Sequence, residues 1–298
     1  MKRIIVFLMC MLMVSNAFAI NDWRRGSNDA PLLGTDNPSD IDANSENYAF
    51  APLDKLLTNY IYGCTLTYAS AATVTIGIGE VNCSDGTIHR MRKNTSTVTI
   101  TLPALGASGG SLDTGNAAIS TWYHVYAVAD ANATTFTGIC SASASAPTGY
   151  TYYRYIGSFY NNVSDNIEPF YWTGKGPQAT IIWNNPITIT TAASAGVWSG
   201  ATSCAAAMPS TSILAIFGVS EWSQVGSGGV IIRPNGSTMS EDYANGAVIT
   251  VSGVGSNGIG GELISATDTS QQINYYTLTA SGGAPTYEIA VKGYIINR

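Results

Sequence analysis

The chain has 298 residues, of which 45% are hydrophobic and only 11% charged, and its formal net charge is −6 at pH 7. Phosphate recognition relies on clustered cations. A balance of 13 Lys and Arg against 19 Asp and Glu therefore argues against a nucleic-acid binder and against binding to anionic membrane surfaces. Soluble domains carry roughly 25% charged residues, and this lower fraction is typical of a β-rich secreted surface protein.

Residues 1–19 have the features of a targeting segment rather than of a folded element. Lys2 and Arg3 precede an apolar run at residues 4–14, and Ala17 and Ala19 form a small-x-small cleavage site. This order is that of a secretory signal peptide. No later stretch approaches the ~18 uninterrupted apolar residues that cross a bilayer. The sequence therefore predicts a secreted protein with no membrane span after cleavage behind Ala19.

Residues 20–58 form an acidic segment with seven Asp and Glu among Pro, Asn and Ser. We expect an extended arm that leads into one short helix near residues 50–60, with Pro52 well placed at the helix start. Two interpretations stay open for the arm. It is either a flexible tether or a segment that docks on a neighbouring subunit.

From residue 59 to 175 the pattern changes to alternating apolar and polar positions rich in β-branched residues, which is typical of half-buried strands. This stretch predicts a first antiparallel β domain. Its expected strands lie at residues 74–81, 97–102, 122–129 and 149–159.

Residues 176–298 repeat this texture with Gly-rich turns, including Asn235-Gly236, Asn245-Gly246 and Asn257-Gly258, which supply positive φ at little cost. Short strands at this spacing predict a second antiparallel β-sandwich, so that the whole fold is all-β with two jelly-roll-like domains behind the arm. The expected strands are 212–219, 229–234, 247–251, 262–265, 272–278 and 287–296.

Export also changes how the cysteines are interpreted. Cys10 would leave with the signal peptide, and an even set of four remains in a compartment where disulfides persist. We favour a Cys64–Cys83 bond, because the two residues bracket two strand candidates about a small-residue turn, and Cys140–Cys204 follows by elimination. The alternative is four buried free thiols. No metal or other cofactor is expected, since there is no C-x-x-C pattern and His89 and His124 fit no ligand spacing.

Several short phrases resemble proteins of tailed bacteriophages. They are Leu-Asp-Thr-Gly at 112–115, the runs at 121–130 and 143–159, and the closing phrases at 198–212, 271–275 and 293–295. Over about residues 110–298 the chain resembles tail-fibre and other virion-surface β-sandwich proteins. The resemblance implies an attachment or structural role, often as a homotrimer.

Candidate catalytic groups are weak. Glycosidases need two carboxylates that flank the bond, and Asp165 with Glu168 or Glu241 with Asp242 could supply them. A Cys140, His124 and Asp130 set could also be drawn. Adjacent acids in loops are usually solvated turn residues, and Cys140 is better explained by a disulfide. We therefore predict no catalytic residues.

The aromatic residues carry the strongest indication of binding. Tyr171, Trp172 and Trp183 lie near Gly174, Pro177 and Pro186, where loops would present flat rings to a glycan or a protein partner. The alternative is that these rings fill the junction between the two β domains.

These features favour a non-enzymatic, exported surface protein, a fibre subunit or adhesin that works as a homo-oligomer or filament. Charge is depleted from interface cores, as it is in this chain. The alternative is a monomeric secreted carbohydrate-binding module that recognises a cell-surface glycan, and the third hypothesis is a polysaccharide-degrading enzyme.

Overall fold

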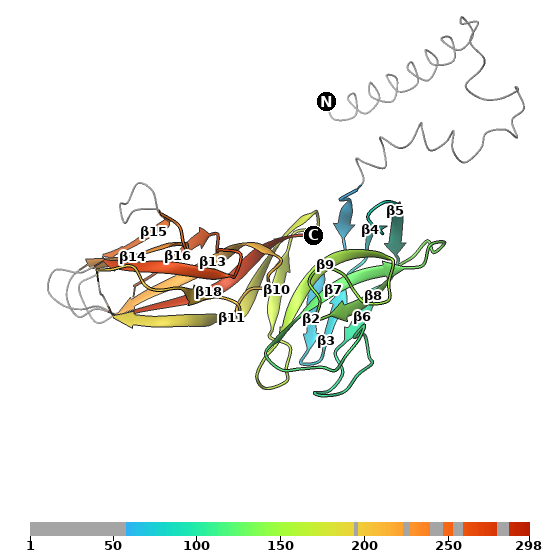
Figure 1. Ribbon diagram of the computed structural model, residues 1–298, viewed down its shortest axis with the longest axis horizontal. Coiled ribbons are helices and arrows are strands. Elements are labelled where there is room, and N and C mark those ends of the chain that lie inside the picture. The colour runs from blue at the N-terminus through green and yellow to red at the C-terminus, as the bar shows by residue number, and fades with distance from the viewer. Residues whose placement is uncertain (1–57, 194–195, 223–226, 239–246, 253–258, 279–285) are drawn as a thin grey trace, which may run out of the picture. The chain divides into compact units, whose positions relative to one another are not determined.

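The computed structural model describes residues 58–298, apart from 194–195, 223–226, 239–246, 253–258 and 279–285 (Figure 1). The predicted signal peptide at 1–19 and the predicted arm up to residue 57 lie outside the described residues. Every regular element in the described part is a β-strand, so the all-β prediction is confirmed. Within that part, no helix has the length and apolar character that a membrane span requires.

The first half of the described chain forms two antiparallel sheets. Sheet A has the order β1-β4-β9-β7-β8, with β5 paired to β4, and sheet B has the order β2-β3-β6. The strands of sheet A are β1 (Ile61–Gly63), β4 (Gly79–Ser84), β5 (His89–Asn94), β7 (Thr121–Ala129), β8 (Thr137–Ser141) and β9 (Tyr152–Asn161). Those of sheet B are β2 (Leu66–Ser70), β3 (Thr73–Ile76) and β6 (Val98–Thr101).

Sheet B covers part of one face of sheet A, and a glycine marks the contact. In β3 the apolar Val74 and Ile76 are buried while the two threonines beside them are not, as the period of two requires. A Cβ on Gly138 of β8 would lie 2.5 Å from Ile100 Cδ1 and 2.8 Å from Ile76 Cδ1. The missing side chain at Gly138 therefore lets the two sheets approach.

The second half forms sheets C and D. Sheet C has the order β10-β11-β18-β13-β16 and sheet D the order β12-β17-β14-β15. The strands of sheet C are β10 (Phe170–Thr173), β11 (Gln178–Ala193), β13 (Ser212–Trp222), β16 (Ile259–Ser265) and β18 (Thr286–Asn297). Those of sheet D are β12 (Thr202–Ser203), β14 (Ser227–Pro234), β15 (Ala247–Ser252) and β17 (Gln272–Leu278).

The antiparallel pairs of these two sheets are nested. From β11 to β18, the first strand pairs with the last, the second with the seventh, the third with the sixth, and the fourth with the fifth. The chain is thus one long folded-back ribbon that is divided between two sheets. Figure 1 shows β11, β18 and β13 side by side in this arrangement.

The structure differs from the sequence expectations at several places. Strands β5 and β8 were not expected, and three further differences have clear physical reasons. The strand expected at 74–81 is two strands, β3 and β4, because the chain passes from sheet B to sheet A around Gly77. The long strand β11 was missed because Asn-Asn-Pro at 184–186 is typical of a loop, whereas it forms an irregularity in the ladder between Ile182 and Ile187. β10, placed in the first domain by the boundary at 175, pairs with β11 of the second.

Among the described residues, the larger of two hydrophobic clusters contains members from sheets A to D, and the smaller one comprises Tyr126, Val128 and Ile139 of β7 and β8. Residues 57–298 form one compact unit. Strand β18 lies between β11 and β13 and is buried over most of its length. Fully burying one aliphatic or aromatic side chain stabilises a fold by about 1.5–3 kcal/mol. The larger cluster has members from both predicted domains, 59–175 and 176–298, and the boundary between them stays a prediction.

Candidate functional site

The three aromatic residues that the sequence singled out lie on strands β10 and β11, not in loops. Tyr171 is 63% exposed, and its hydroxyl donates a hydrogen bond to Asn184 Oδ1 at 3.1 Å. It pairs with Ile182 across the ladder of β10 and β11. Of the three rings, this one is the most accessible.

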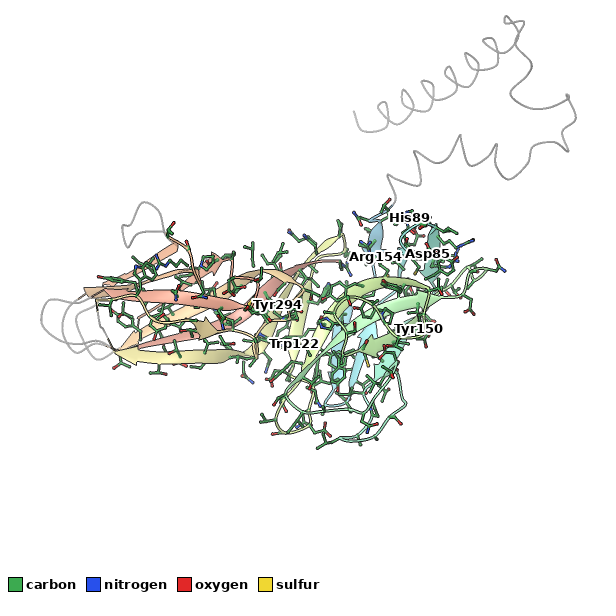
Figure 2. The ribbon with its side chains drawn as sticks, viewed as in Figure 1. Asp85, His89, Trp122, Tyr150, Arg154 and Tyr294 are labelled. Carbon is green, nitrogen blue, oxygen red and sulfur yellow. The ribbon has the colours of Figure 1, made fainter. Side chains whose placement is uncertain are left out.

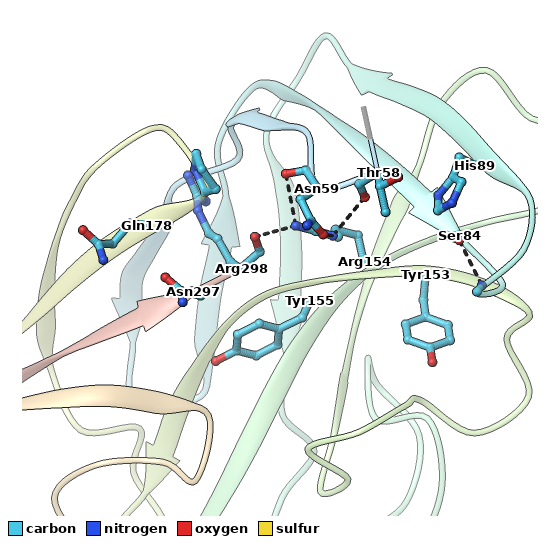
Figure 3. Close-up of a pocket in the computed structure, with 12 residues that line it drawn as sticks. Thr58, Asn59, Ser84, His89, Tyr153, Arg154, Tyr155, Gln178, Asn297 and Arg298 are labelled. Carbon is cyan, nitrogen blue, oxygen red and sulfur yellow. Dashed lines mark hydrogen bonds between the residues drawn. The ribbon is translucent and has the colours of Figure 1, made fainter. Parts of the chain in front are cut away.

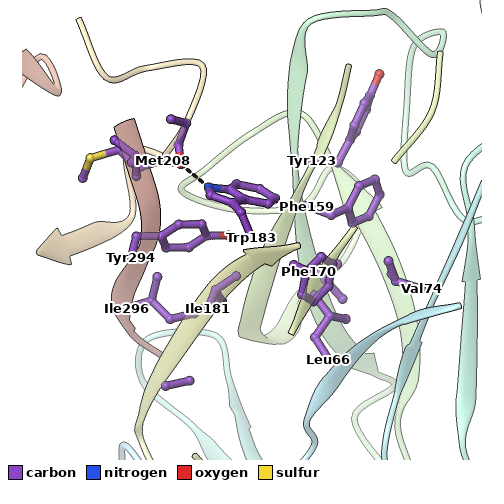
Figure 4. Close-up of a cluster of buried hydrophobic side chains, with 14 of the residues drawn as sticks. Leu66, Val74, Tyr123, Phe159, Phe170, Ile181, Trp183, Met208, Tyr294 and Ile296 are labelled. Atoms are coloured by element: carbon purple, nitrogen blue, oxygen red, sulfur yellow. Dashed lines mark hydrogen bonds between the residues drawn. The ribbon is translucent and has the colours of Figure 1, made fainter. Parts of the chain in front are cut away.

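Trp183 is only 3% exposed and belongs to a cluster of aromatic rings that we call the aromatic junction. Its ring lies 5.8 Å from that of Trp122 on β7 and 5.7 Å from that of Tyr294 on β18, and Trp122 lies 5.1 Å from Tyr160. The four rings join sheet A to sheet C. Figure 4 shows Trp183 and Tyr294 among the buried side chains.

The indole N–H groups of this junction have backbone partners. Trp183 Nε1 donates to Ala207 O at 2.9 Å and Trp122 Nε1 to Ala205 O at 2.7 Å. A buried indole needs such a partner to avoid the cost of an unpaired donor. Neither N–H is left for a ligand, so the aromatic junction is a packing element.

Trp172 lies against strand β9 of sheet A. A Cβ on Gly157 of β9 would come within 2.8 Å of Trp172 Cζ3, and the Arg298 guanidinium lies 5.1 Å from the centre of the Trp172 ring. Its indole N–H donates to Gly174 O at 2.9 Å. Trp172 therefore contacts β9 and a cation, and it is partly buried.

Next to Tyr294 of the aromatic junction lies a chain of hydrogen-bonded polar side chains, of which His124 and Ser158 are buried and Tyr155 and Thr211 half-buried. We call it the buried polar chain. His124 Nδ1 and Ser158 Oγ are 2.8 Å apart, Ser158 Oγ and the Tyr155 hydroxyl 2.8 Å, and that hydroxyl and Thr211 Oγ1 2.7 Å. Burial lowers the pKa of His124 to about 4, so that the imidazole is neutral at pH 7. A neutral histidine that has a hydroxyl as its hydrogen-bond partner can be buried in the core without leaving that ring nitrogen unpaired.

The predicted disulfides are absent, and this corrects the sequence expectation. Cys64, Cys83, Cys140 and Cys204 are buried free thiols. Gly63 pairs with Gly79, which places Cys83 four residues further along β4, on the order of 13 Å away at about 3.3 Å per residue. A disulfide tolerates Cα separations up to roughly 7 Å. Burial is the largest cause that raises the pKa of Cys64 to about 11 and of the other three to about 12.

The acidic residues considered as catalytic pairs hold turns together. Asp165 accepts hydrogen bonds from Leu105 N and Asn161 Nδ2, and Glu168 accepts one from Asn162 Nδ2. Glu241 and Asp242 lie outside the described residues. Asp165 and Glu168 thus have neighbouring amide donors as partners, as turn carboxylates commonly do.

A cavity of about 670 Å³ opens where β4, β9 and β18 come together. We call it the junction cavity. Strand register brings its walls together, since Ser84 lies opposite both His89 and Tyr153, and Gln178 lies opposite Asn297. Figure 3 shows these side chains around Arg154 and Arg298. The full lining is Thr58, Asn59, Ser84, Gly86, His89, Tyr153, Arg154, Tyr155, Pro177, Gln178, Asn297 and Arg298.

Arg154 crosses between segments that are far apart in the sequence. Its Nη1 donates to Thr58 O and Asn59 Oδ1, and its Nη2 donates to Asn59 O and to Arg298 O. Its Nε is buried and has no partner among the described residues. Burial lowers the pKa of Arg154, because the charged form loses hydration. The guanidinium therefore fixes the entry of the described chain against the end of β18.

Arg298 ties β18 back to β1 in the same way. Its guanidinium donates to Gly63 O, Cys64 O and Gly176 O at 2.8–2.9 Å. The side chain is 4% exposed, and burial lowers its pKa to about 10, so that it is still a cation at pH 7. Two cations, the buried Arg298 and the half-buried Arg154, thus stand at one cavity that no Asp or Glu side chain lines.

The sequence did not reveal this cavity. Arg154 lies in a tyrosine-rich run and Arg298 is more than two hundred residues from Gly63, so no local spacing links them. The one signal was Arg154 itself, a cation within an otherwise uncharged strand. Within the described residues, no cluster of His, Cys, Asp and Glu side chains has the makings of a metal site.

Comparisons with known proteins add little. No family model and no curated protein matches the chain. Among solved structures it is similar to one of infectious bursal disease virus Gx strain, at 10% identity and a TM-score of 0.18, with 78% of this chain and 65% of that chain covered. Infectious bursal virus derived T=1 particles match at 11% identity and a TM-score of 0.16, with 80% and 65% covered.

The chain spans about 65% of the length of these two viral chains. A TM-score this low does not establish a shared fold, so the description of the fold rests on the strand order alone. The resemblance of residues 110–298 to tailed-phage fibre proteins stays a prediction.

Proposed function

We propose that the chain is a non-enzymatic, exported surface protein that assembles with copies of itself and serves as a structural or attachment subunit. The observation that carries this proposal is the nested pairing of β11 through β18. Eight strands paired in this order and divided between two sheets support a jelly roll in this half of the chain, and sheets A and B would form a second sandwich. Jelly rolls build viral capsid and lectin domains. The step from fold to role is an analogy at the level of the fold.

Composition supports self-assembly. The chain carries few charges, and charged residues are depleted at interface cores. Sheets C and D end in β10, β16, β12 and β15, each of which pairs with one strand of its own sheet among the described residues. An open strand edge is a natural place for a second chain to add. The acidic arm at residues 20–57 would be a candidate for such an addition.

Two arrangements support the non-enzymatic part of the proposal. The Ser158 and His124 pair, which has hydrogen-bond geometry, is fully inside the core, with Ser158 at 0% exposure. A nucleophile and its base must reach substrate to act. Asp165 and Glu168 are each held by neighbouring amide groups.

A second candidate function is recognition of a glycan, and the junction cavity favours it. The cavity combines tyrosine rings with amide side chains from Asn59, Gln178 and Asn297. Ligand sites typically measure 300–1,000 Å³ and place a few polar groups on an apolar wall. Attachment to a surface and binding of its glycans are compatible roles for one protein.

Light scattering of two purified chains tests the proposed assembly. One chain spans residues 20–298 and the other residues 57–298, which form a compact unit and retain the Thr58 and Asn59 oxygens that bind Arg154. We expect a stable multimer from the longer chain and a monomer from the shorter one. A multimer from both chains would support self-assembly but show that the arm is not required for it. A monomer from both chains at all concentrations would overturn the structural role.

A further inference from the structure

We propose that the junction cavity binds a sugar that carries a carboxylate, such as a uronic acid. This inference rests on the glycan-recognition candidate above and names its ligand class. It draws on three features of the cavity: the sign of its charge, the mixture of rings and amides on its walls, and its size.

The charge of the cavity is opposite to that of the protein. The chain carries a net charge of −6, yet two arginines and no Asp or Glu side chain line the cavity. In a protein that ends at Arg298, the main-chain oxygen that Arg154 binds belongs to a carboxylate, so the two cations less this one anion leave the lining with a charge of +1. Asp85 lies in the turn beside His89, as Figure 2 shows, but its Oδ1 accepts hydrogen bonds from Thr87 N and Ile88 N. That carboxylate is engaged by its own turn.

Low exposure makes these two cations effective. Charges interact more strongly in a partly buried site than in open water, because the local dielectric is lower. Four oxygens occupy the Nη donors of Arg154 and three oxygens bind Arg298. The two guanidinium groups therefore act on a ligand mainly through their field, and they are held rigidly in place.

Direct contacts would come from the amides. Gln178 and Asn297 lie opposite each other at the ends of β11 and β18, and both are exposed. A side-chain amide both donates and accepts, as sugar hydroxyls require. Tyr153 and Tyr155 line the same cavity. The Tyr155 ring packs against His124 and Tyr126, so the half-buried Tyr153 is the ring that offers a flat apolar surface to a sugar face.

Size favours a sugar over an acidic peptide. A cavity of about 670 Å³ is in the range of small-molecule sites. An extended peptide more often adds along a strand edge through main-chain hydrogen bonds, whereas side chains dominate the lining of this cavity. A short saccharide with one carboxylate matches its volume and its charge.

Isothermal titration of the full mature chain with D-glucuronate, D-galacturonate and N-acetylneuraminate tests the proposal, with glucose and galactose as neutral counterparts. For a monosaccharide of this size we expect a Kd on the order of 1 mM. At least one acid should bind about tenfold more tightly than glucose or galactose. Equal binding of acetate would show a plain anion site, and binding only of a peptide with the sequence of residues 36–46 would show an arm site. Either result overturns the proposal, as does no binding of any of the three acids.

A variant that adds a negative charge to the lining tests whether the ligand binds in this cavity. Asn297→Asp adds a carboxylate at an exposed lining position with almost no change of shape, and like charges at an interface are strongly unfavourable. We expect the affinity for the acidic sugar to fall about tenfold or more. Asn185→Asp is the matched control, because it adds the same charge at an exposed residue of β11 outside the lining. Equal losses in both variants would overturn the placement.

Failure of this proposal is distinguishable from failure of the proposed function. The light-scattering experiment reports assembly and uses no sugar, and the titration reports binding whatever the mass of the particle. A multimer without acidic-sugar binding would keep the structural role and remove the ligand class.

Discussion

The same two halves of the described chain are connected in two different ways, by packed rings at the aromatic junction and by arginine hydrogen bonds at the junction cavity. At the aromatic junction, Trp122, Trp183 and Tyr294 pack ring against ring and their polar atoms bind backbone or buried oxygens. At the cavity, Arg154 and Arg298 reach across to backbone oxygens and leave space between them and the exposed amides. The aromatic junction is filled by packed rings, whereas the region around the two arginines is charged and open.

The difference teaches where binding should be sought in this fold. Tryptophan is often taken as a mark of a glycan site, but the buried Trp183 has no free ring face or N–H. The aromatic residues of the sequence did not point to the cavity, yet two arginines and no side-chain carboxylate line it. Stability and recognition are therefore assigned to different residues, and each assignment can be tested.

The largest effect is expected at the aromatic junction. Trp183→Ala removes a ring that is 3% exposed and leaves Ala207 O without its indole donor. Buried Trp to Ala changes cost about 3–5 kcal/mol. We expect a loss of that size in the free energy of unfolding, measured by urea titration.

The matched control is Tyr171→Ala on the facing strand. Its ring is 63% exposed and makes one hydrogen bond, to Asn184, so the change should stay within about 0.5 kcal/mol. Equal losses for the two variants would contradict the packing role of Trp183.

The buried polar chain should make stability depend on pH. The pKa of His124 is about 4 in the folded protein against 6.5 for the free side chain, so between these values the unfolded chain binds the proton and the folded one does not. Stability from this group is complete above pH 6.5 and is lost as the pH falls toward 4. The whole shift corresponds to at most about 3 kcal/mol.

Urea titrations at pH 7, 5.5 and 4 measure this dependence. The variant His124→Gln cannot take up a proton and should flatten the slope between pH 6.5 and 4. A variant that keeps the slope of the parent protein would show that other groups cause it.

A smaller effect is expected where β9 meets Trp172. In Gly157→Ala the new Cβ would lie 2.8 Å from Trp172 Cζ3 and 3.5 Å from Leu66 Cδ2. Overpacking of this kind costs about 1–3 kcal/mol. Gly200→Ala meets nothing within 4 Å and should be close to neutral. Thermal unfolding of both variants compares them, and a neutral Gly157→Ala would show that Trp172 moves aside freely.

The thiols should show no reaction at all in the folded state. Burial raises the pKa of Cys83, Cys140 and Cys204 to about 12 and of Cys64 to about 11, and the thiolate is the reactive form. Ellman's reagent at pH 8 should therefore label the mature protein only after urea is added. Four thiols are then expected, whereas disulfides would leave none to label.

The sequence was a good guide to strands and a poor guide to the site, for physical reasons. The pattern at residues 122–129 predicted β7 with its bounds nearly correct, but both faces of the strand are buried at residues 123–128, rather than the one face that alternation implies. Sequence patterns failed at β11, where Asn-Asn-Pro at 184–186 looks like a turn but lies inside the strand, as an interruption of its pairing with β18.

The cavity could not have been predicted from local patterns. Arg154 has its structural role because it binds Asn59 and Arg298, and those contacts form only when the fold brings β9 and β18 together. The cysteine prediction failed for a related reason. An even count says nothing about Cα separation, which the register of β1 and β4 fixes.

The most direct test of this account is equilibrium unfolding of the mature protein in urea, followed by tryptophan fluorescence and by far-ultraviolet circular dichroism. The aromatic junction and the arginines join all four sheets into one compact unit whose larger hydrophobic cluster spans them. We therefore predict a single transition with coincident curves from the two probes. Two separated transitions, one for residues 58–169 and one for residues 170–298, would contradict it.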